Sequence, residues 1–250
     1  MKLLLAAVLF VSLSFLSSCK KIADFEAPCK ILTITEKTQY LPTGTILTNT
    51  LRFYYNSKGD PIRLDFDRNE TGKPDYFFTY DNKGRLTELV TKYESAVEFT
   101  HHYYYNSKHF VSYDTTFYGR PTSYLIYVIN KYSYDDKGRI SRVDHKASSG
   151  PEFVSRFEYN DAGNRTLAFN NTPLDGSTYD NKVNFLRTNL IFAFLQRDYS
   201  MNNRRAATSY NAKNLPLAFP NYPYLDPNSQ PTILFLNMQV YEITYSCENK

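Results

Sequence analysis

The sequence predicts an all-β fold: a single long twisted antiparallel β-sheet made of hairpin repeats, with at most one short helix covering a face. The first observation is a repeated phrase in which a tyrosine precedes an asparagine or aspartate. It recurs at intervals of 25, 25, 29 and 25 residues, at Tyr55, Tyr80, Tyr105, Tyr134 and Tyr159. A period of this length is typical of repeat architectures. The second observation is the content of 23 Tyr and 18 Phe among 250 residues, side chains that suit a pleated, half-buried surface.

Each copy of the phrase predicts one bulged β-hairpin. An aromatic residue stands two positions before the tyrosine, so both side chains share one face of a strand. These pairs are Phe53/Tyr55, Phe78/Tyr80, Tyr103/Tyr105, Tyr132/Tyr134 and Phe157/Tyr159. The Asn or Asp, two polar residues and Gly that follow favour a type I turn closed by a residue with positive φ. His109 replaces this Gly in the third copy and Asn214 in a weaker sixth copy, and both residue types tolerate positive φ better than most.

The repeats resemble the YD repeats of RHS and teneurin-type proteins, and more closely those of small Bacteroidota lipoproteins, over roughly residues 45–217. The resemblance implies a sheet of hairpins that share one face, because a lone hairpin is only marginally stable in water. It implies little about activity.

The flanking segments extend the predicted sheet. Residues 29–35 and 45–55 alternate as strands, and residues 232–246 show the pattern of one further long strand. Residues 182–199 have apolar side chains near helical spacing, which predicts either a short helix on one face or another strand. We expect residues 29–250 to form a single β-repeat domain.

The N-terminal segment predicts a lipid anchor. A short basic start precedes an apolar run from Leu3 to Leu16, which as a helix spans roughly 21 Å, less than the ~30 Å hydrocarbon core of a bilayer. The sequence Leu16-Ser17-Ser18-Cys19 resembles the lipobox of bacterial lipoproteins. The resemblance implies a signal peptide over residues 1–18, lipid on Cys19 and a tether over 19–28. It places the protein on the outer membrane, facing either the cell surface or the periplasm.

Two further cysteines, Cys29 and Cys247, bracket the predicted sheet. In an exported protein such a pair is a disulfide candidate, which would join the first strand to the last. The alternative is two unrelated thiols.

One loop is similar to the calcium-binding loops of dockerin and thrombospondin type 3 repeats. Asp67, Asn69, Thr71 and Asp75 fall on the ligand positions, and Gly72 permits a tight turn. This predicts Ca²⁺ as the one candidate cofactor. The alternative is a polar hairpin loop, because Thr71 replaces a carboxylate.

A second candidate site is the segment 214–231, which holds five of the twelve prolines and cannot be a central strand. Its aromatic residues Phe219, Tyr222 and Tyr224 would suit sugar rings or a protein partner. The alternative is that they pack onto the sheet. For Tyr54 and Tyr104, on the second face of the strands, we expect burial in the core rather than an exposed stacking platform.

The remaining patterns exclude several functions. Charges are interspersed at a net +4, so no nucleic-acid partner is indicated. His101 and His102 point to opposite strand faces, and no catalytic or zinc-binding spacing is present. The sequence therefore predicts a non-catalytic envelope lipoprotein that acts as a binding or scaffold module for a glycan or an envelope protein. The alternative is a polysaccharide-acting enzyme at the cell surface, because a pair of catalytic carboxylates need not be close in sequence.

Overall fold

The computed structural model describes residues 29–40, 44–69, 71–94, 96–119, 127–167, 171–174, 178–220, 232–236 and 238–247. Within them the predicted all-β fold is confirmed: thirteen strands form one antiparallel sheet, accompanied by one α-helix. The consecutive strands are β1 (Ile31–Tyr40), β2 (Thr45–Tyr55), β3 (Pro61–Phe66), β4 (Asp75–Tyr80), β5 (Leu86–Tyr93), β6 (Ala96–Tyr105), β7 (Val111–Tyr118), β8 (Tyr127–Tyr134), β9 (Ile140–Ala147) and β10 (Phe153–Arg156). The later elements are η2 (Phe185–Thr188), α1 (Leu190–Gln196), β11 (Ser209–Tyr210), β12 (Pro216–Ala218), β13 (Thr232–Ile233), η3 (Leu234–Leu236), β14 (Met238–Gln239) and β15 (Glu242–Tyr245).

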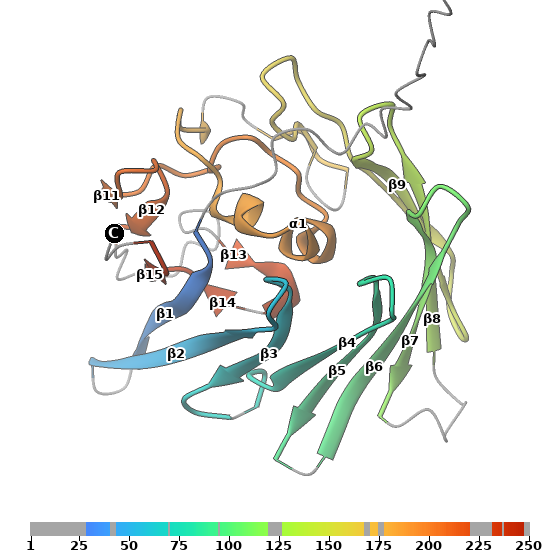
Figure 1. Ribbon diagram of the computed structural model, residues 1–250, viewed down its shortest axis with the longest axis horizontal. Helices are drawn as coiled ribbons and strands as arrows, with labels where there is room; N and C mark the ends of the chain where they lie inside the picture. The colour runs from blue at the N-terminus through green and yellow to red at the C-terminus, as the bar shows by residue number, and fades with distance from the viewer. Residues whose placement is uncertain are drawn as a thin grey trace, which may run out of the picture.

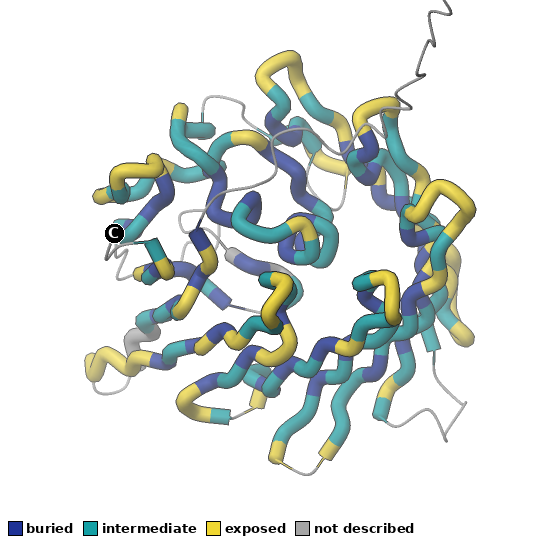
Figure 2. Tube along the Cα trace, in the orientation of Figure 1, coloured by how far each residue is buried: buried dark blue, intermediate teal, exposed yellow. Residues whose placement is uncertain are grey.

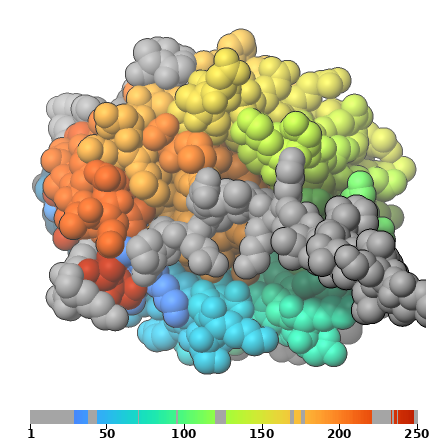
Figure 3. Space-filling model, turned by 45° about the horizontal axis from the view of Figure 1, so that its top comes forward, coloured from blue at the N-terminus to red at the C-terminus, as the bar shows by residue number. Residues whose placement is uncertain are grey.

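Strands β1 to β10 pair in chain order, and the sheet continues past β1 through β15, β12 and β11. The strands curve around α1, which lies inside the arc (Figure 1). In the space-filling view, residues after β10, coloured yellow to orange, lie along the upper half of the visible face. The strands coloured cyan and green lie along its lower half (Figure 3). The concave side of the sheet is therefore covered by the C-terminal part of the chain.

The turns follow one hydrogen-bonding plan. The Asn56 side chain accepts hydrogen bonds from the backbone N–H groups of Lys58 and Asp60, at 2.9 and 3.0 Å. The same pair of bonds recurs at Asp81, Asn106, Asp135 and Asn211. The residue three positions after the Asn or Asp has positive φ in each copy, including His109 at 65° and Asn214 at 61°. The predicted bulged hairpins are confirmed for five copies, because a register shift adjoins the turns after β2, β4, β6, β8 and β11. The fifth copy departs from the prediction: only an isolated bridge between Tyr159 and Arg165 flanks its turn.

A ladder of tyrosine hydroxyls ties the first four repeats to the preceding part of the sheet. The Tyr80 hydroxyl donates to the backbone carbonyl of Pro61 at 2.6 Å. Equivalent bonds join Tyr55 to Ile31, Tyr105 to Leu86 and Tyr134 to Val111, at 2.8, 2.8 and 2.9 Å. Burial raises the pKa of these tyrosines, to about 12 for Tyr105. The recurring phrase of the repeat thus forms an inter-repeat contact as well as a turn.

The predicted faces of the strands are also confirmed. The aromatic residue three positions before each turn Asn or Asp belongs to the core clusters or packs against them. Buried and less buried positions alternate along the strands, as the colouring of the chain shows (Figure 2). The helix completes that core: Phe192 of α1 meets Phe53 of β2 edge to face, with ring centroids 5.5 Å apart. Asn189 caps the helix by accepting from the N–H of Ile191 at 2.9 Å. Of the two alternatives for residues 182–199, the helix is the correct one.

The C-terminal segment corrects one expectation. Residues 232–246 do not form a single long strand, because η3 separates β13 from β14 and only β15 joins the main sheet, beside β1. Next to this pairing, Cys29 and Cys247 form a disulfide, with Cα atoms 5.2 Å apart. First and last strand are therefore joined both by pairing and covalently. The described residues include no helix long and apolar enough to span a membrane.

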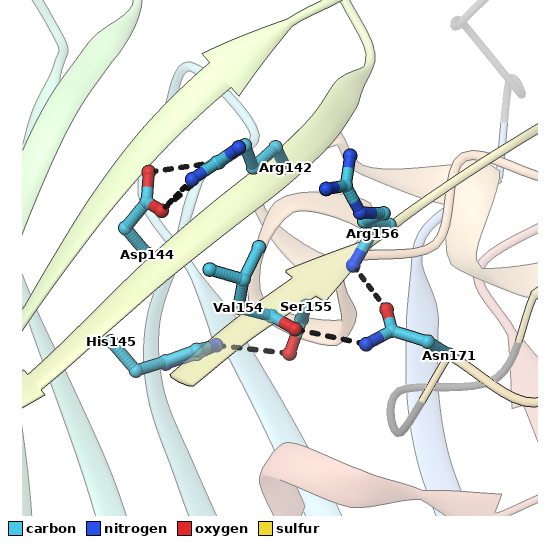
Figure 4. A network of polar contacts seen from close by, with 7 residues as sticks. All are labelled: Arg142, Asp144, His145, Val154, Ser155, Arg156 and Asn171. Carbon is cyan, nitrogen blue, oxygen red and sulfur yellow. Dashed lines mark hydrogen bonds and ion pairs between the residues drawn. The ribbon is translucent and has the colours of Figure 1, made fainter. Parts of the chain in front are cut away.

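The free edge of β10 is capped by a side chain. Asn171, which lies beyond this edge, donates from Nδ2 to the carbonyl of Val154 at 2.9 Å and accepts from the N–H of Arg156 at 2.6 Å (Figure 4). The amide thus takes the place of a neighbouring strand. Edge strands with unpaired backbone groups invite pairing with another chain, so this cap blocks part of the edge.

Candidate ligand-binding site

A cavity of about 450 Å³ lies between the concave face of β4–β8 and the C-terminal end of α1. Its size falls in the range of small-molecule sites. Six aromatic side chains contribute to its wall: Tyr76, Phe99, Tyr103, Tyr132, Phe194 and Phe235. Polar side chains from β5, β6, β7, β8 and the end of α1 line the rest. The cavity thus combines apolar ring faces with fixed polar groups.

Asp114 of β7 organises the polar wall. Its side chain is 2% exposed, and it accepts hydrogen bonds from Thr116 Oγ1 at 3.2 Å, from Asn130 Nδ2 at 2.9 Å and from the Tyr132 hydroxyl. A buried carboxylate is tolerated when such donors replace water. Burial, with the charge of Asp114 next, raises the pKa of Tyr132 well above its usual value, so the phenol keeps the proton that it donates.

The network fixes the tautomer of His101 on β6. Thr116 has one hydroxyl proton, and the Asp114 carboxylate, which can only accept, takes it. His101 Nδ1 lies 2.8 Å from Thr116 Oγ1 and must therefore donate to it. This leaves Nε2 as a hydrogen-bond acceptor on a half-buried ring that lines the cavity. Burial lowers the pKa of His101 to about 4, so the ring is neutral at neutral pH.

A second relay continues from Asp114 across the sheet. Because Asn130 donates its Nδ2 to Asp114, its Oδ1 faces His145 Nδ1, at 2.7 Å. His145 Nδ1 therefore carries the proton, and Nε2 accepts from Ser155 Oγ at 3.0 Å (Figure 4). Burial, followed by the charge of Arg197, lowers the pKa of His145 to about 4. One row of hydrogen bonds across β7–β10 thus holds the polar wall rigid.

The cavity has one positively charged lining residue, Arg197, among those described. This residue ends α1 in the left-handed conformation, at φ 53°, and its guanidinium carbon lies 5.8 Å from the centre of the Tyr132 ring. Beside burial, which dominates, the pKa values of Tyr103 and Tyr132 are raised by the charge of Asp114 and lowered by that of Arg197. Opposite charges therefore offset each other in this part of the cavity.

Glu98 of β6 is the other carboxylate of the wall. The Tyr93 hydroxyl donates to its Oε1 at 3.1 Å, and Thr91 Oγ1 donates to its Oε2 at 3.4 Å. Its side chain is half-buried and lines the cavity. Asp114 pairs in register with Tyr103, five residues along β6 from Glu98. The two carboxylates therefore lie in different parts of the cavity.

Sequence reasoning missed this site, although the repeats contain a signal for it. Two positions of the repeat face the core. Eight residues after the turn Asn or Asp, the first four repeats have Leu64, Leu89, Asp114 and Val143. Five residues before the turn Asn or Asp, the first five repeats have Leu51, Tyr76, His101, Asn130 and Ser155. Polar residues replace apolar ones at Asp114, His101, Asn130 and Ser155. Such a departure within a repeat marks the polar wall.

Two of the four predicted calcium ligands, Asp67 and Asp75, have other partners for their carboxylates. The Asp67 carboxylate pairs with Arg52, and Asp75 Oδ1 accepts from the N–H of Phe66 at 3.1 Å. Asn69 Nδ2 donates to the carbonyl of Lys92 at 3.4 Å, and Thr71 is exposed. No group of three or more His, Cys, Asp or Glu side chains that could hold a metal occurs among the described residues. Calcium binding by this loop stays a prediction.

The structure settles one alternative for the predicted aromatic sites and corrects one expectation. Phe219 is 1% exposed and packs against Phe185 in the core, so of its two alternatives packing, rather than stacking on a ligand, is the correct one. Tyr54 and Tyr104 are not in the core: they are 44% and 41% exposed on the convex face, because their strand positions alternate with core positions. Tyr222 and Tyr224 lie outside the described residues, as do Cys19 and the rest of the predicted anchor.

The comparisons with known proteins add little. No protein-family profile matches the chain, and a search of curated proteins finds no match. The solved structure described as "Crystal Structure of TcdB2-TccC3-Cdc42" is similar over 61% of this chain, with 13% identity and a TM-score of 0.31. The match covers 10% of the length of that chain. A likeness at this TM-score does not establish a shared fold.

Proposed function

We propose that the protein is a non-catalytic binding module of the cell envelope, lipid-anchored through Cys19, and that the cavity beneath α1 holds its ligand. The observation that carries this proposal is the combination of aromatic faces with fixed polar groups around about 450 Å³ of space. Sites of this kind bind ligands through apolar contact and gain specificity from a few polar atoms. A glycan fits this site better than a protein surface does, because the site is concave.

The anchor part of the proposal rests on the sequence. The Leu16–Cys19 motif follows an apolar run at the distance expected of a lipoprotein signal. The disulfide between Cys29 and Cys247 is consistent with export, since such bonds persist in oxidising compartments.

The geometry favours binding over glycoside hydrolysis. Glycosidases that use two carboxyl groups hold them roughly 5–9.5 Å apart. Glu98 and Asp114 are five register positions apart on neighbouring strands, which separates their Cα atoms by roughly 17 Å at about 3.3 Å per residue. Asp114 is also occupied by three donors from the protein itself.

The test uses two adjacent histidines on opposite faces. His101 lines the cavity, whereas His102 pairs with Glu88 on the convex face. In a glycan-array screen of the full chain, followed by calorimetry of the glycans that bind, we expect His101→Leu to weaken binding about tenfold, the effect of roughly 1.4 kcal/mol. His102→Leu should leave binding unchanged.

Running the screen with calcium and with a chelator also tests the Asp67–Asp75 loop. Binding that the chelator abolishes and His101→Leu leaves intact would move the site from the cavity to that loop. An array without any bound glycan would contradict the glycan proposal.

A further inference from the structure

Among the described residues, the cavity contains one carboxylate, that of Glu98, whose charge no neighbouring cation balances. The hydrogen bonds to Glu98 come from two neutral hydroxyls, those of Tyr93 and Thr91. No ion pair joins it to a Lys, Arg or His of the described part of the chain. Lys73, which follows the cavity residue Gly72, is engaged by Glu36 at 2.8 Å. Glu98 therefore offers its negative charge to whatever occupies the cavity.

The surroundings of Glu98 suit an ammonium group. Tyr76, Phe99 and Phe235 line the same cavity, and the rings of Tyr76 and Phe235 meet edge to face at 6.5 Å. The charge of Glu98 reaches Tyr76, where it is the second cause, after burial, of a raised pKa. Aromatic faces attract cations, and a carboxylate beside them strengthens the attraction.

The rest of the cavity does not compete for the cation. Asp114 already accepts hydrogen bonds from three protein donors, and its charge is offset by Arg197. What that part presents to a ligand is the neutral acceptor Nε2 of His101. It therefore suits a hydroxyl donor rather than a second charge.

We propose that the ligand is an amino sugar or an oligomer that contains one, with its protonated amine against Glu98 and a hydroxyl donating to His101. This inference rests on the proposed binding function and names the chemistry of its ligand. It requires no covalent step.

The experiment compares two sugars that differ at one group. Glucosamine trimer carries protonated amines, whereas N-acetylglucosamine trimer carries neutral amides on the same ring. Binding of each to the full chain in detergent is measured by calorimetry at pH 6, where the amines are charged. We expect the native protein to bind the glucosamine trimer at least tenfold more tightly.

Glu98→Gln is the decisive variant, because it keeps the shape and hydrogen-bond acceptor of the side chain and removes its charge. We expect it to abolish the preference by weakening binding of the amine form alone. Glu88→Gln, on the convex face, is the matched control and should retain the preference. A trilysine arm tests whether any ammonium-bearing ligand suffices; the inference expects it to bind weakly, because it lacks hydroxyl donors for His101.

The outcomes separate the two proposals. Equal binding of both trimers, unchanged in Glu98→Gln, overturns the ammonium contact and leaves glycan binding intact. If trilysine binds, neither trimer binds, and Glu98→Gln abolishes the binding of trilysine, the proposal of an amino-sugar ligand is overturned and the cation is located at Glu98. Absence of binding by all three probes overturns the amino-sugar inference, and the glycan array then decides separately whether the protein binds other sugars.

Discussion

The two histidines on the concave face are held neutral by their surroundings. His101 donates to Thr116, and His145 lies between Asn130 and Ser155. Burial lowers both pKa values to about 4, from a usual value of 6.5. Between these values the unfolded chain binds more protons than the folded one. Their contribution to stability is therefore complete above pH 6.5 and is lost as the pH falls toward 4.

The free energy of unfolding should therefore decrease with falling pH, and His145 should contribute part of this decrease. Each pH unit below 6.5 should lower the free energy of unfolding by up to about 1.4 kcal/mol for each histidine. Urea unfolding at pH 7 and pH 5 measures it, and the comparison of variants cancels the titration of the carboxylates. His145→Gln should be less stable at pH 7 and should show a smaller loss between the two pH values.

If His145→Gln and the native protein lost the same stability between pH 7 and pH 5, the neutral state of His145 in the fold would be wrong.

The cavity residues show what the sequence could and could not predict at this scale. Alternation along the strands predicts that Tyr103 faces the core, and it does. The same alternation places Asp114, Asn130 and His145 inward, in one row across β7, β8 and β9. Read one at a time, such polar residues look like solvated surface positions. Only pairing across strands shows that they bond to one another, and pairing is a long-range property.

At the scale of elements, the turn carries most of the local information. The turn Asn or Asp accepts hydrogen bonds from backbone N–H groups, and the residue three positions later is left-handed. Both features depend on nearby residues, so the sequence predicts them well. The strand expected over residues 45–55 coincides with β2. The prediction of one strand over residues 232–246 was wrong, because several short strands satisfy the same period-two spacing as one long strand. At η3 the chain makes a tertiary contact that local sequence does not reveal, the donation from the Tyr76 hydroxyl to the carbonyl of Phe235 at 3.0 Å.

The third turn predicts a stabilising substitution. His109 has φ 65°, whereas the equivalent position is glycine in four other copies. His109→Gly should raise the free energy of unfolding by about 0.5–1 kcal/mol, because relief of left-handed strain exceeds the entropy that glycine adds to the unfolded chain. Thermal or urea unfolding measures the change.

Gly84→His provides the reciprocal variant. Gly84 has φ 77°, and a Cβ added there would meet no atom within 4 Å, so the cost is conformational rather than steric. It should destabilise the protein by a similar amount. A stabilising effect of this exchange would show that the turn does not require a left-handed residue.

At the scale of the whole molecule, the sheet depends on the contact between its N-terminal and C-terminal strands. The repeats predict a long sheet and the cysteines predict a link between the first and last strand, and both are present. The curl of the sheet around α1 was beyond sequence reasoning. It arises from the accumulated twist of many strands and from the packing of Phe192 and Phe194 onto the concave face.

The disulfide should therefore stabilise the entire sheet. It spans 218 residues, for which the chain-entropy model gives about 5 kcal/mol, and measured losses are typically 2–5 kcal/mol. We expect the double variant Cys29→Ser, Cys247→Ser to lose this amount in urea unfolding under oxidising conditions.

Adding a reductant should shift the native protein to the stability of the double variant and leave the variant unchanged. Equal stability of native protein and variant without reductant would contradict the prediction and would leave the β1–β15 pairing as the sufficient connection.

The tyrosine ladder has a consequence for how such a molecule changes over generations. Each of these hydroxyls donates to the adjoining part of the sheet, so a unit of about 25 residues contains the hydrogen bond that joins it to its neighbour. Duplication or loss of one unit in the gene would keep the hydrogen bonds of the other units and would change how far the sheet wraps around α1. The width of the cavity can therefore change in whole repeats, while point substitutions at the inward positions set the chemistry of its wall.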